Sequence, residues 1–172
     1  MPITPDTKDW TWVLNRPCPD CGYDTSTFEP AGVAAMIRAN SAAWPRVLER
    51  ADVRERPNAD TWSPLEYAAH VRDVLRLMDA RIRMMLQTDD PTYPSWDQDE
   101  TAVRERYGEQ DPATVSAELQ AAAERFAATL DAVPEDAWSR TGRRGDGATF
   151  TVASLATYSA HDPIHHLWDV RG

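Results

Sequence analysis

The chain contains 172 residues, of which 42% are hydrophobic and 27% are charged, and its formal net charge is −10. This length and balance predict a globular domain with its own hydrophobic core. No apolar stretch is long enough to cross a membrane, and the N-terminus lacks a secretory signal pattern, so a cytoplasmic location is expected. Nucleic-acid binding is not expected, because the chain is acidic and has a single lysine, Lys8.

Residues 1–29 are expected to form an N-terminal extension around the outside of a domain that spans residues 30–172. The extension contains Cys18 and Cys21 in a Cys-x-x-Cys-Gly turn. This turn resembles half of a zinc knuckle, but the second half is missing, and no βαβ pattern follows that would favour a thioredoxin-like redox role. We therefore expect a reduced surface loop, with a metal or redox role as the alternative.

The first predicted helix runs from about residue 30 to residue 51. Its apolar line, spaced by three and four residues, consists of Val33, Ile37, Asn40, Trp44, Leu48 and Ala51. Pro45 falls inside the run and is expected to kink the helix near its end. Because Asn40 lies on the apolar line, its amide is expected to be buried and hydrogen-bonded.

A second helix is predicted from Ser63 to about Gln87. Ser63 and Glu66 form a capping-box pattern, with a proline at the first helical position. His70 falls on the apolar side of this helix, so its ring should point toward the core. Arg81 lies close to the same side, and we expect a buried stem with a guanidinium at the surface.

Two further long helices follow. One begins at residues 111–112 and carries a regular apolar stripe to about residue 133, and the other runs from about residue 150 to residue 170. Residues 88–110 form a connection with a short helix, and residues 134–150 read as an irregular loop or short hairpin. Four helices joined by longer loops predict an all-α four-helix bundle, with helix directions in the order up-down-down-up.

Three of the four histidines suit a divalent metal. His161 and His165 are four residues apart and lie one above the other on a helix, and His70 faces the core from a second helix. A shared cation would satisfy three imidazoles that are otherwise costly to bury. His166 is turned by about 100° from His165 and is expected to be a separate histidine. The alternative is that all are separate, or that Pro163 starts a new helix and breaks the one-face geometry.

The sequence resembles the DinB-like superfamily of metal-binding four-helix bundles, which includes mycothiol- and bacillithiol-dependent transferases. The resemblance rests on WSPLEYAAH at residues 62–70, followed by VRD, and on the His-x-x-x-His pair near the C-terminus. It covers roughly residues 30–170 and implies His70, His161 and His165 as metal ligands. The extension lies outside the shared domain, and the residues after His165 depart from the family pattern, which leaves the substrate open.

Three protein ligands would leave the ion an open position for chemistry. By resemblance, the first hypothesis is a metal-dependent transferase that adds a low-molecular-weight thiol to an electrophile or isomerises a substrate, with zinc or nickel as the first candidate metals. A metal-dependent hydrolase is the alternative, and a non-catalytic metal-binding stress-response protein is a third. The expected partner is a small-molecule substrate, with a homodimer as one option.

Several side chains close to the histidines in the sequence are candidates for a supporting role. Tyr67 and Tyr158 precede two of the histidines by three residues, so each could donate to a substrate or simply line the core. Four acidic side chains are expected to be surface charges, with orientation of a ligand imidazole as the alternative: Glu66, Asp73, Asp162 and Asp169.

Overall fold

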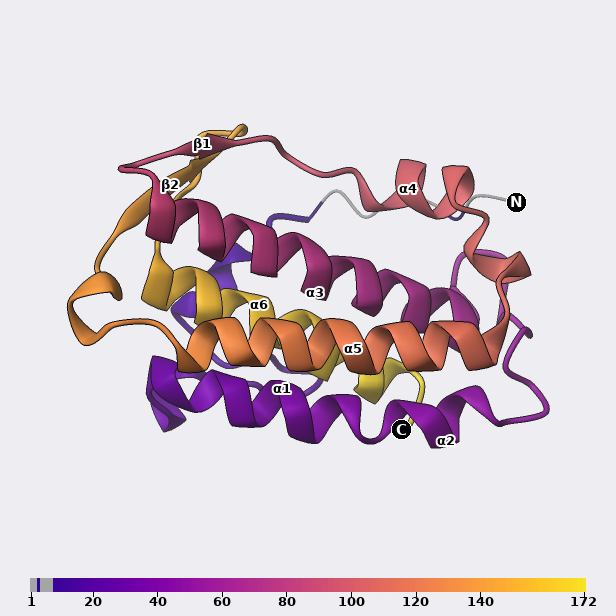
Figure 1. Cartoon of the computed structure of the whole chain (residues 1–172). Helices are drawn as coiled ribbons and strands as arrows, with labels where there is room; N and C mark the ends of the chain where they lie inside the picture. Colours follow the sequence, from indigo (N-terminus) through magenta and orange to yellow (C-terminus); the bar gives the residue numbers. More distant parts are fainter. Residues whose placement is uncertain (1–2, 4–7) are drawn as a thin grey trace.

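The helical segments expected from the periodicity are present in the computed structural model, which describes residue 3 and residues 8–172 (Figure 1). The α-helices are α1 (Val33–Ser41), α2 (Trp44–Leu48), α3 (Pro64–Gln87), α4 (Gln98–Arg104), α5 (Pro112–Asp131) and α6 (Val152–Asp169). The strands are β1 (Thr92–Tyr93), β2 (Thr141–Arg144) and β3 (Thr149–Thr151). Among the described residues, no helix combines the length and apolarity that crossing a membrane requires.

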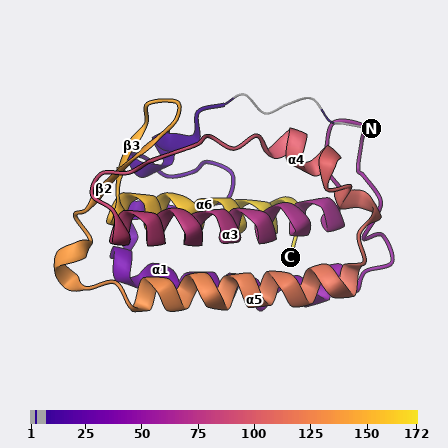
Figure 2. The same cartoon turned by 45° about the horizontal axis from the view of Figure 1, so that its top comes forward.

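Four helical segments form the bundle. Helix α3 packs against α5 and α6, and α1 also packs against α5 and α6. Figure 2 shows α3 and α6 in one layer and α1 and α5 in the other. The largest fully buried side chains between them include Ile37, Trp44, Leu75, Leu119, Phe126 and Leu155. The chain is therefore a mostly helical four-helix bundle, as expected.

The first predicted helix is divided in two, because α1 ends at Ser41 and α2 begins at Trp44. Pro45 lies in the first turn of α2, where a residue without an N–H is tolerated, so the expected kink is a complete break. Asn40 is buried and hydrogen-bonded, as predicted. Its Nδ2 donates to the Pro163 carbonyl at 2.9 Å, and its Oδ1 accepts from Trp44 Nε1 at 3.2 Å.

Helix α3 begins with the predicted capping box. The Ser63 hydroxyl accepts from the Glu66 backbone N–H at 3.3 Å, and the Glu66 carboxylate accepts from the Ser63 N–H at 2.9 Å. Glu66 also pairs with Arg56. These contacts make Glu66 a buried structural carboxylate, not the expected surface charge.

A three-stranded sheet corrects the all-α expectation. Strands β2 and β3 form the hairpin that was one of the two options for residues 134–150, and β1 pairs with β2 in parallel. The pairing of β1 was not predictable, because a two-residue strand has no periodicity and its partner lies about 50 residues away. The sheet lies at one end of the bundle (Figure 1).

Three segments cover the outer face of the α3–α6 layer. They are the N-terminal segment (residues 8–29), the chain from α3 to α5 that includes β1 and α4, and the β2–β3 hairpin (Figure 2). The chain from α3 returns along the length of that helix before α5 begins (Figure 1). The α3–α6 face is thus enclosed by irregular segments instead of a further helix pair.

Replacing Asn40 by Ala tests how firmly α1 holds α6. The variant leaves the Pro163 carbonyl and the Trp44 indole N–H buried without their partner, which should lower the free energy of unfolding by about 2 to 4 kcal/mol. Urea denaturation measures the loss. Arg38→Ala, which removes exposed ion pairs from the same helix, should have a clearly smaller effect. Equal losses in the two variants would contradict this role of Asn40.

Candidate metal centres

Helix α6 carries four potential metal ligands, which are His161, Asp162, His165 and His166. The helix continues through Pro163 without interruption. The alternative in which Pro163 starts a new helix is therefore wrong. Proline lacks the N–H that would bond to the Ser159 carbonyl, so the helix loses one internal hydrogen bond at this point. The Asn40 amide bonds to the Pro163 carbonyl, which ties this weak point of α6 to α1.

The structure distributes the three predicted ligands between two clusters. His70 joins Asp162 and His166, a set that we call the triad, and His161 and His165 join Cys18 and Cys21, which we call the thiol cluster. Within each cluster the potential ligand atoms lie within 4.8 Å of one another. Among the described residues, no such group contains all three predicted histidines. Metal binding by each histidine stays a prediction, but the grouping differs from the expected one.

The triad joins α3 to α6. His70 Nε2 lies 3.2 Å from Asp162 Oδ2, and His166 Nε2 lies 3.7 Å from the same oxygen. His70 is fully buried, as predicted. The other carboxylate oxygen, Asp162 Oδ1, is buried and has no hydrogen-bond partner among the described residues. Two imidazoles and a carboxylate with one unpartnered oxygen therefore lie close together.

The electrostatics keep Asp162 ionised. Burial by itself would raise the pKa of this carboxyl, but the nearby His70 and His166 and the hydrogen bond to His70 outweigh it, and the net effect lowers the pKa. Asp162 is therefore a carboxylate at neutral pH, the form that binds a cation. Its expected role as an ordinary surface charge is wrong.

Aromatic rings and a carboxylate orient the two imidazoles. The His70 ring stacks on Trp96 with centroids 5.5 Å apart and contacts Trp62 at 5.2 Å. His166 Nδ1 donates to Asp169 Oδ2 at 2.8 Å, and the Tyr67 ring lies 4.8 Å away. A hydrogen bond from Nδ1 leaves Nε2 as the nitrogen that faces Asp162, which is the usual way in which a metal-binding histidine is oriented.

The thiol cluster joins the N-terminal segment to α6. Cys18 Sγ lies 3.6 Å from His165 Nδ1, and neither cysteine forms a disulfide. Gly22, at φ +73°, closes the turn, with its N–H donating to the Cys18 carbonyl at 3.0 Å. The turn lies at the surface with both cysteines free, as expected, since Pro19, Asp20 and Gly22 are exposed, but the Cys18 side chain is buried against α6. His161 and His165 of α6 place two further potential ligand atoms beside this turn.

Burial also sets the charge of these groups. It lowers the pKa of His161 to about 4, with a further contribution from His165, and it lowers the pKa of His165 as well. Both imidazoles are therefore neutral at neutral pH. His161 Nε2 is buried and has no hydrogen-bond partner among the described residues. A neutral imidazole with a free nitrogen is the form that binds a metal.

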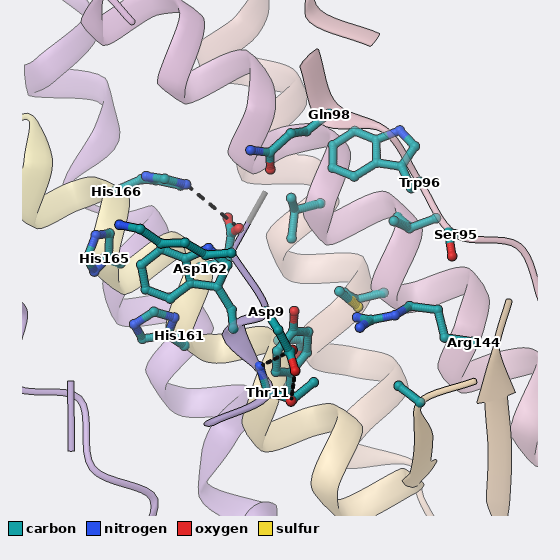
Figure 3. A pocket seen from close by; sticks show the side chains of 18 of the residues that line it. Asp9, Thr11, Ser95, Trp96, Gln98, Arg144, His161, Asp162, His165 and His166 are labelled. Carbon is teal, nitrogen blue, oxygen red and sulfur yellow. Dashed lines mark hydrogen bonds and ion pairs between the residues drawn. The ribbon is translucent and has the colours of Figure 1, made fainter. Parts of the chain in front are cut away.

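A cavity of about 1170 Å³ lies beside both clusters, on the covered face of α3 and α6. Figure 3 shows the α6 histidines on one wall, with Trp96 and Gln98 on a second wall and Arg144 on the opposite side. Arg81 also lines the cavity.

Arg81 is buried, which corrects the expectation of a surface guanidinium. Its Nη2 donates to the Pro94 carbonyl at 2.8 Å, and its Nε has no hydrogen-bond partner among the described residues. The segment that follows α3 buries this side chain. The periodicity of α3 alone does not predict that this segment folds back over the helix.

Sequence reasoning missed Asp162 and His166 because α6 offers two pairs with the same spacing. Residues 161 and 165 form one pair, and residues 162 and 166 form the other, shifted by one residue and hence rotated by about 100°. The helix is apolar around most of its circumference, so its rotation could not be fixed from the pattern. The spacing of Asp162 and His166 by four residues was the sequence pattern that could have indicated a second pair of ligands.

Comparisons with known proteins agree with this architecture. The family model of the DinB superfamily matches residues 34–170. The structure is similar to YfiT from Bacillus subtilis, described as a probable metal-dependent hydrolase with an unusual four-helix bundle topology, with a TM-score of 0.68, 18% identity, and coverage of 82% of this chain and 83% of that chain.

A second similar structure is a histidine-to-alanine mutant of the mycothiol-dependent maleylpyruvate isomerase, with a TM-score of 0.65 and 14% identity. The match covers 83% of this chain but only 61% of the isomerase. No curated protein sequence matches the chain significantly. The family match, which spans most of the chain, and the four-helix architecture lead to one conclusion: the chain belongs to the DinB superfamily.

Proposed function

We propose that the protein is a divalent-metal-dependent enzyme whose catalytic ion is bound by the triad. The observation that carries this proposal is the convergence of His70, Asp162 and His166 beside a large cavity. Three protein ligands leave coordination positions open, which is typical of catalytic sites, whereas structural zinc sites use four. His161 and His165 are then ligands of a different ion.

The donor set fits a divalent cation. Two histidines and one carboxylate bind zinc in several hydrolytic enzymes and iron in others. The unsatisfied Asp162 Oδ1 supplies the negative charge that such an ion requires. A divalent cation held there would supply a positive charge that favours the deprotonated form of a thiol or water in its open positions.

A small-thiol-dependent transferase is the first activity that we propose. The similar isomerase depends on mycothiol, which shows that this fold can serve a thiol co-substrate in another protein. The cavity volume of about 1170 Å³ exceeds the roughly 300–1,000 Å³ of ordinary small-molecule sites. Room for a bulky thiol and a second reactant together supports a two-substrate reaction.

The chain's own side chains would bind and orient the reactants. Arg81 places a guanidinium at the cavity without a carboxylate hydrogen-bonded to it in the described structure, so it could bind an anionic group of a substrate. Burial raises the pKa of Tyr158, against a lowering effect of Arg144, so its hydroxyl stays protonated and can donate a hydrogen bond. Tyr67 and Trp96 cover the two imidazoles and limit water around them.

A metal-dependent hydrolase is the second candidate, because YfiT is described as a probable enzyme of that kind. The same triad could serve both reactions. They differ in one requirement, since a transferase consumes a thiol and a hydrolase does not.

Metal binding is the first test of the proposal. Asp162→Asn should lower the affinity of the triad for Zn²⁺ or Ni²⁺ by at least about tenfold, because the amide carries no charge to offset the cation. Isothermal titration calorimetry on protein without a histidine tag measures this. Asp146→Asn changes a carboxylate that also lines the cavity but lies outside the triad, and it should leave the affinity unchanged. If Asp162→Asn binds as many ions per chain as the unaltered protein, and each as tightly, the triad does not hold an ion.

Thiol consumption is the second test. Metal-loaded protein should consume mycothiol or bacillithiol in the presence of an electrophile, and the rate should fall at least about 100-fold in Asp162→Asn. A thiol-titrating dye measures the loss of free thiol. Turnover of ester or amide substrates without any thiol would favour the hydrolase instead. A metal-loaded protein with neither activity over a broad substrate panel would support the non-catalytic alternative.

A further inference from the structure

We propose that the thiol cluster is a second metal site, a closed zinc site that fastens the N-terminal segment to α6. Its four members are Cys18 and Cys21 from the extension and His161 and His165 from the helix. The two cysteines lie outside the family match, which begins at residue 34. This site does not depend on the activity proposed for the triad.

The spacing of the donor atoms fits zinc. With Zn–S bonds of about 2.3 Å and Zn–N bonds of about 2.0–2.1 Å, tetrahedral ligand atoms lie about 3.4–3.8 Å apart. Cys18 Sγ and His165 Nδ1 lie 3.6 Å apart, and all four donor atoms lie within 4.8 Å of one another. Only a small contraction is needed to close the shell. The two pairs also have the ligand spacings found in zinc sites, Cys-x-x-Cys and His-x-x-x-His.

Burial provides an independent argument. His161 is 5% exposed, and its Nε2 has no hydrogen-bond partner among the described residues. A buried polar nitrogen without a partner destabilises the folded state, so its position among three other donor atoms favours a ligand there. Cys18 is 2% exposed and its thiol faces His165. A cation bound by all four atoms would satisfy every one of these groups.

The donor types select the metal. Thiolate and imidazole ligands in a four-coordinate site favour zinc over magnesium, calcium or manganese, which prefer oxygen. Two thiolates would also neutralise the double charge of the ion, which suits a buried position. Because four protein ligands leave no open position, this ion would be structural, in contrast to an ion bound by the triad.

The site would fix one wall of the cavity. Trp10 contacts the rings of both α6 ligands, with centroids 5.5 Å from His161 and 5.4 Å from His165. Its neighbours Asp9 and Thr11 line the same cavity (Figure 3). The Tyr23 hydroxyl, just after the cysteine turn, donates to the Thr157 carbonyl of α6 at 2.5 Å. Zinc would therefore hold the N-terminal segment, which is distant from α6 in sequence, against the cavity.

Asp169 connects the two clusters. Its Oδ2 accepts the hydrogen bond from His166 of the triad at 2.8 Å, and its Oδ1 lies 3.8 Å from His165 Nε2. A zinc ion on His165 Nδ1 would fix that ring and its contact with Asp169. The structural ion would in this way help to orient a ligand of the catalytic one.

Cobalt titration tests the site, because thiolate ligands give Co²⁺ an intense near-ultraviolet charge-transfer band that histidine and carboxylate ligands do not. Metal-free protein without a tag should bind two Co²⁺ ions per chain and develop this band. The double variant Cys18→Ser, Cys21→Ser should bind one Co²⁺ without the band. Asp162→Asn should bind the other ion at least about tenfold more weakly and keep the band, which separates failure at this site from failure at the triad.

The unaltered protein by itself can overturn the proposal. If it binds Co²⁺ without a thiolate band under reducing conditions, the four residues do not form a metal site, whatever the variants do. Hydrogen exchange gives a second readout. Backbone amides of residues 9–23 should exchange at least about tenfold faster after zinc removal, and an unchanged rate would contradict a role in fastening this segment.

Discussion

The arrangement of both clusters depends on the rotation of α6 about its own axis. Two ligand pairs, each spaced by four residues and offset by one, point in directions about 100° apart. One pair faces the N-terminal segment, and the other faces His70 on α3. A rotation by a single residue would bring one pair to the position of the other and turn that other pair away from both partners. The continuous helix through Pro163 and the Asn40 bond to its carbonyl hold this rotation in place.

Those features of the bundle that depend on interactions within a single helix were predictable from the sequence. The capping box of α3, the regular stripe of α5 and the burial of His70 all follow from patterns within one helix. The parallel pairing of β1 with β2 and the burial of Arg81 depend on the path of the segment after α3, and no local pattern encodes that path.

The sequence predicts candidate ligands, but it does not predict how the side chains group in space. His70, His161 and His165 were recognised as candidate ligands from their spacing and apolar surroundings, and the structure places each in a group that could hold a metal. The grouping could not be derived, because it required the rotation of an almost uniformly apolar helix. The cysteine turn is incomplete as a local motif for a similar reason, since the histidines grouped with it lie about 140 residues further along the chain. Long-range pairing of two half-motifs leaves no trace in the spacing of either.

The two proposed ions would have complementary tasks. The triad offers one carboxylate and two imidazoles and opens on a cavity, whereas the thiol cluster offers four donors that would enclose an ion. In this proposal the N-terminal segment does more than cover the bundle. It supplies the two cysteines of the thiol cluster and forms one wall of the cavity beside the triad. Asp169, which contacts a histidine of each cluster, makes the two sites one connected structure.

The most direct test is an anomalous-scattering map of zinc-loaded crystals, which locates metal ions without reference to any assumed ligand. We predict two peaks per chain, one among His70, Asp162 and His166 and one among the two cysteines, His161 and His165. A single peak bound jointly by His70, His161 and His165 would contradict this account.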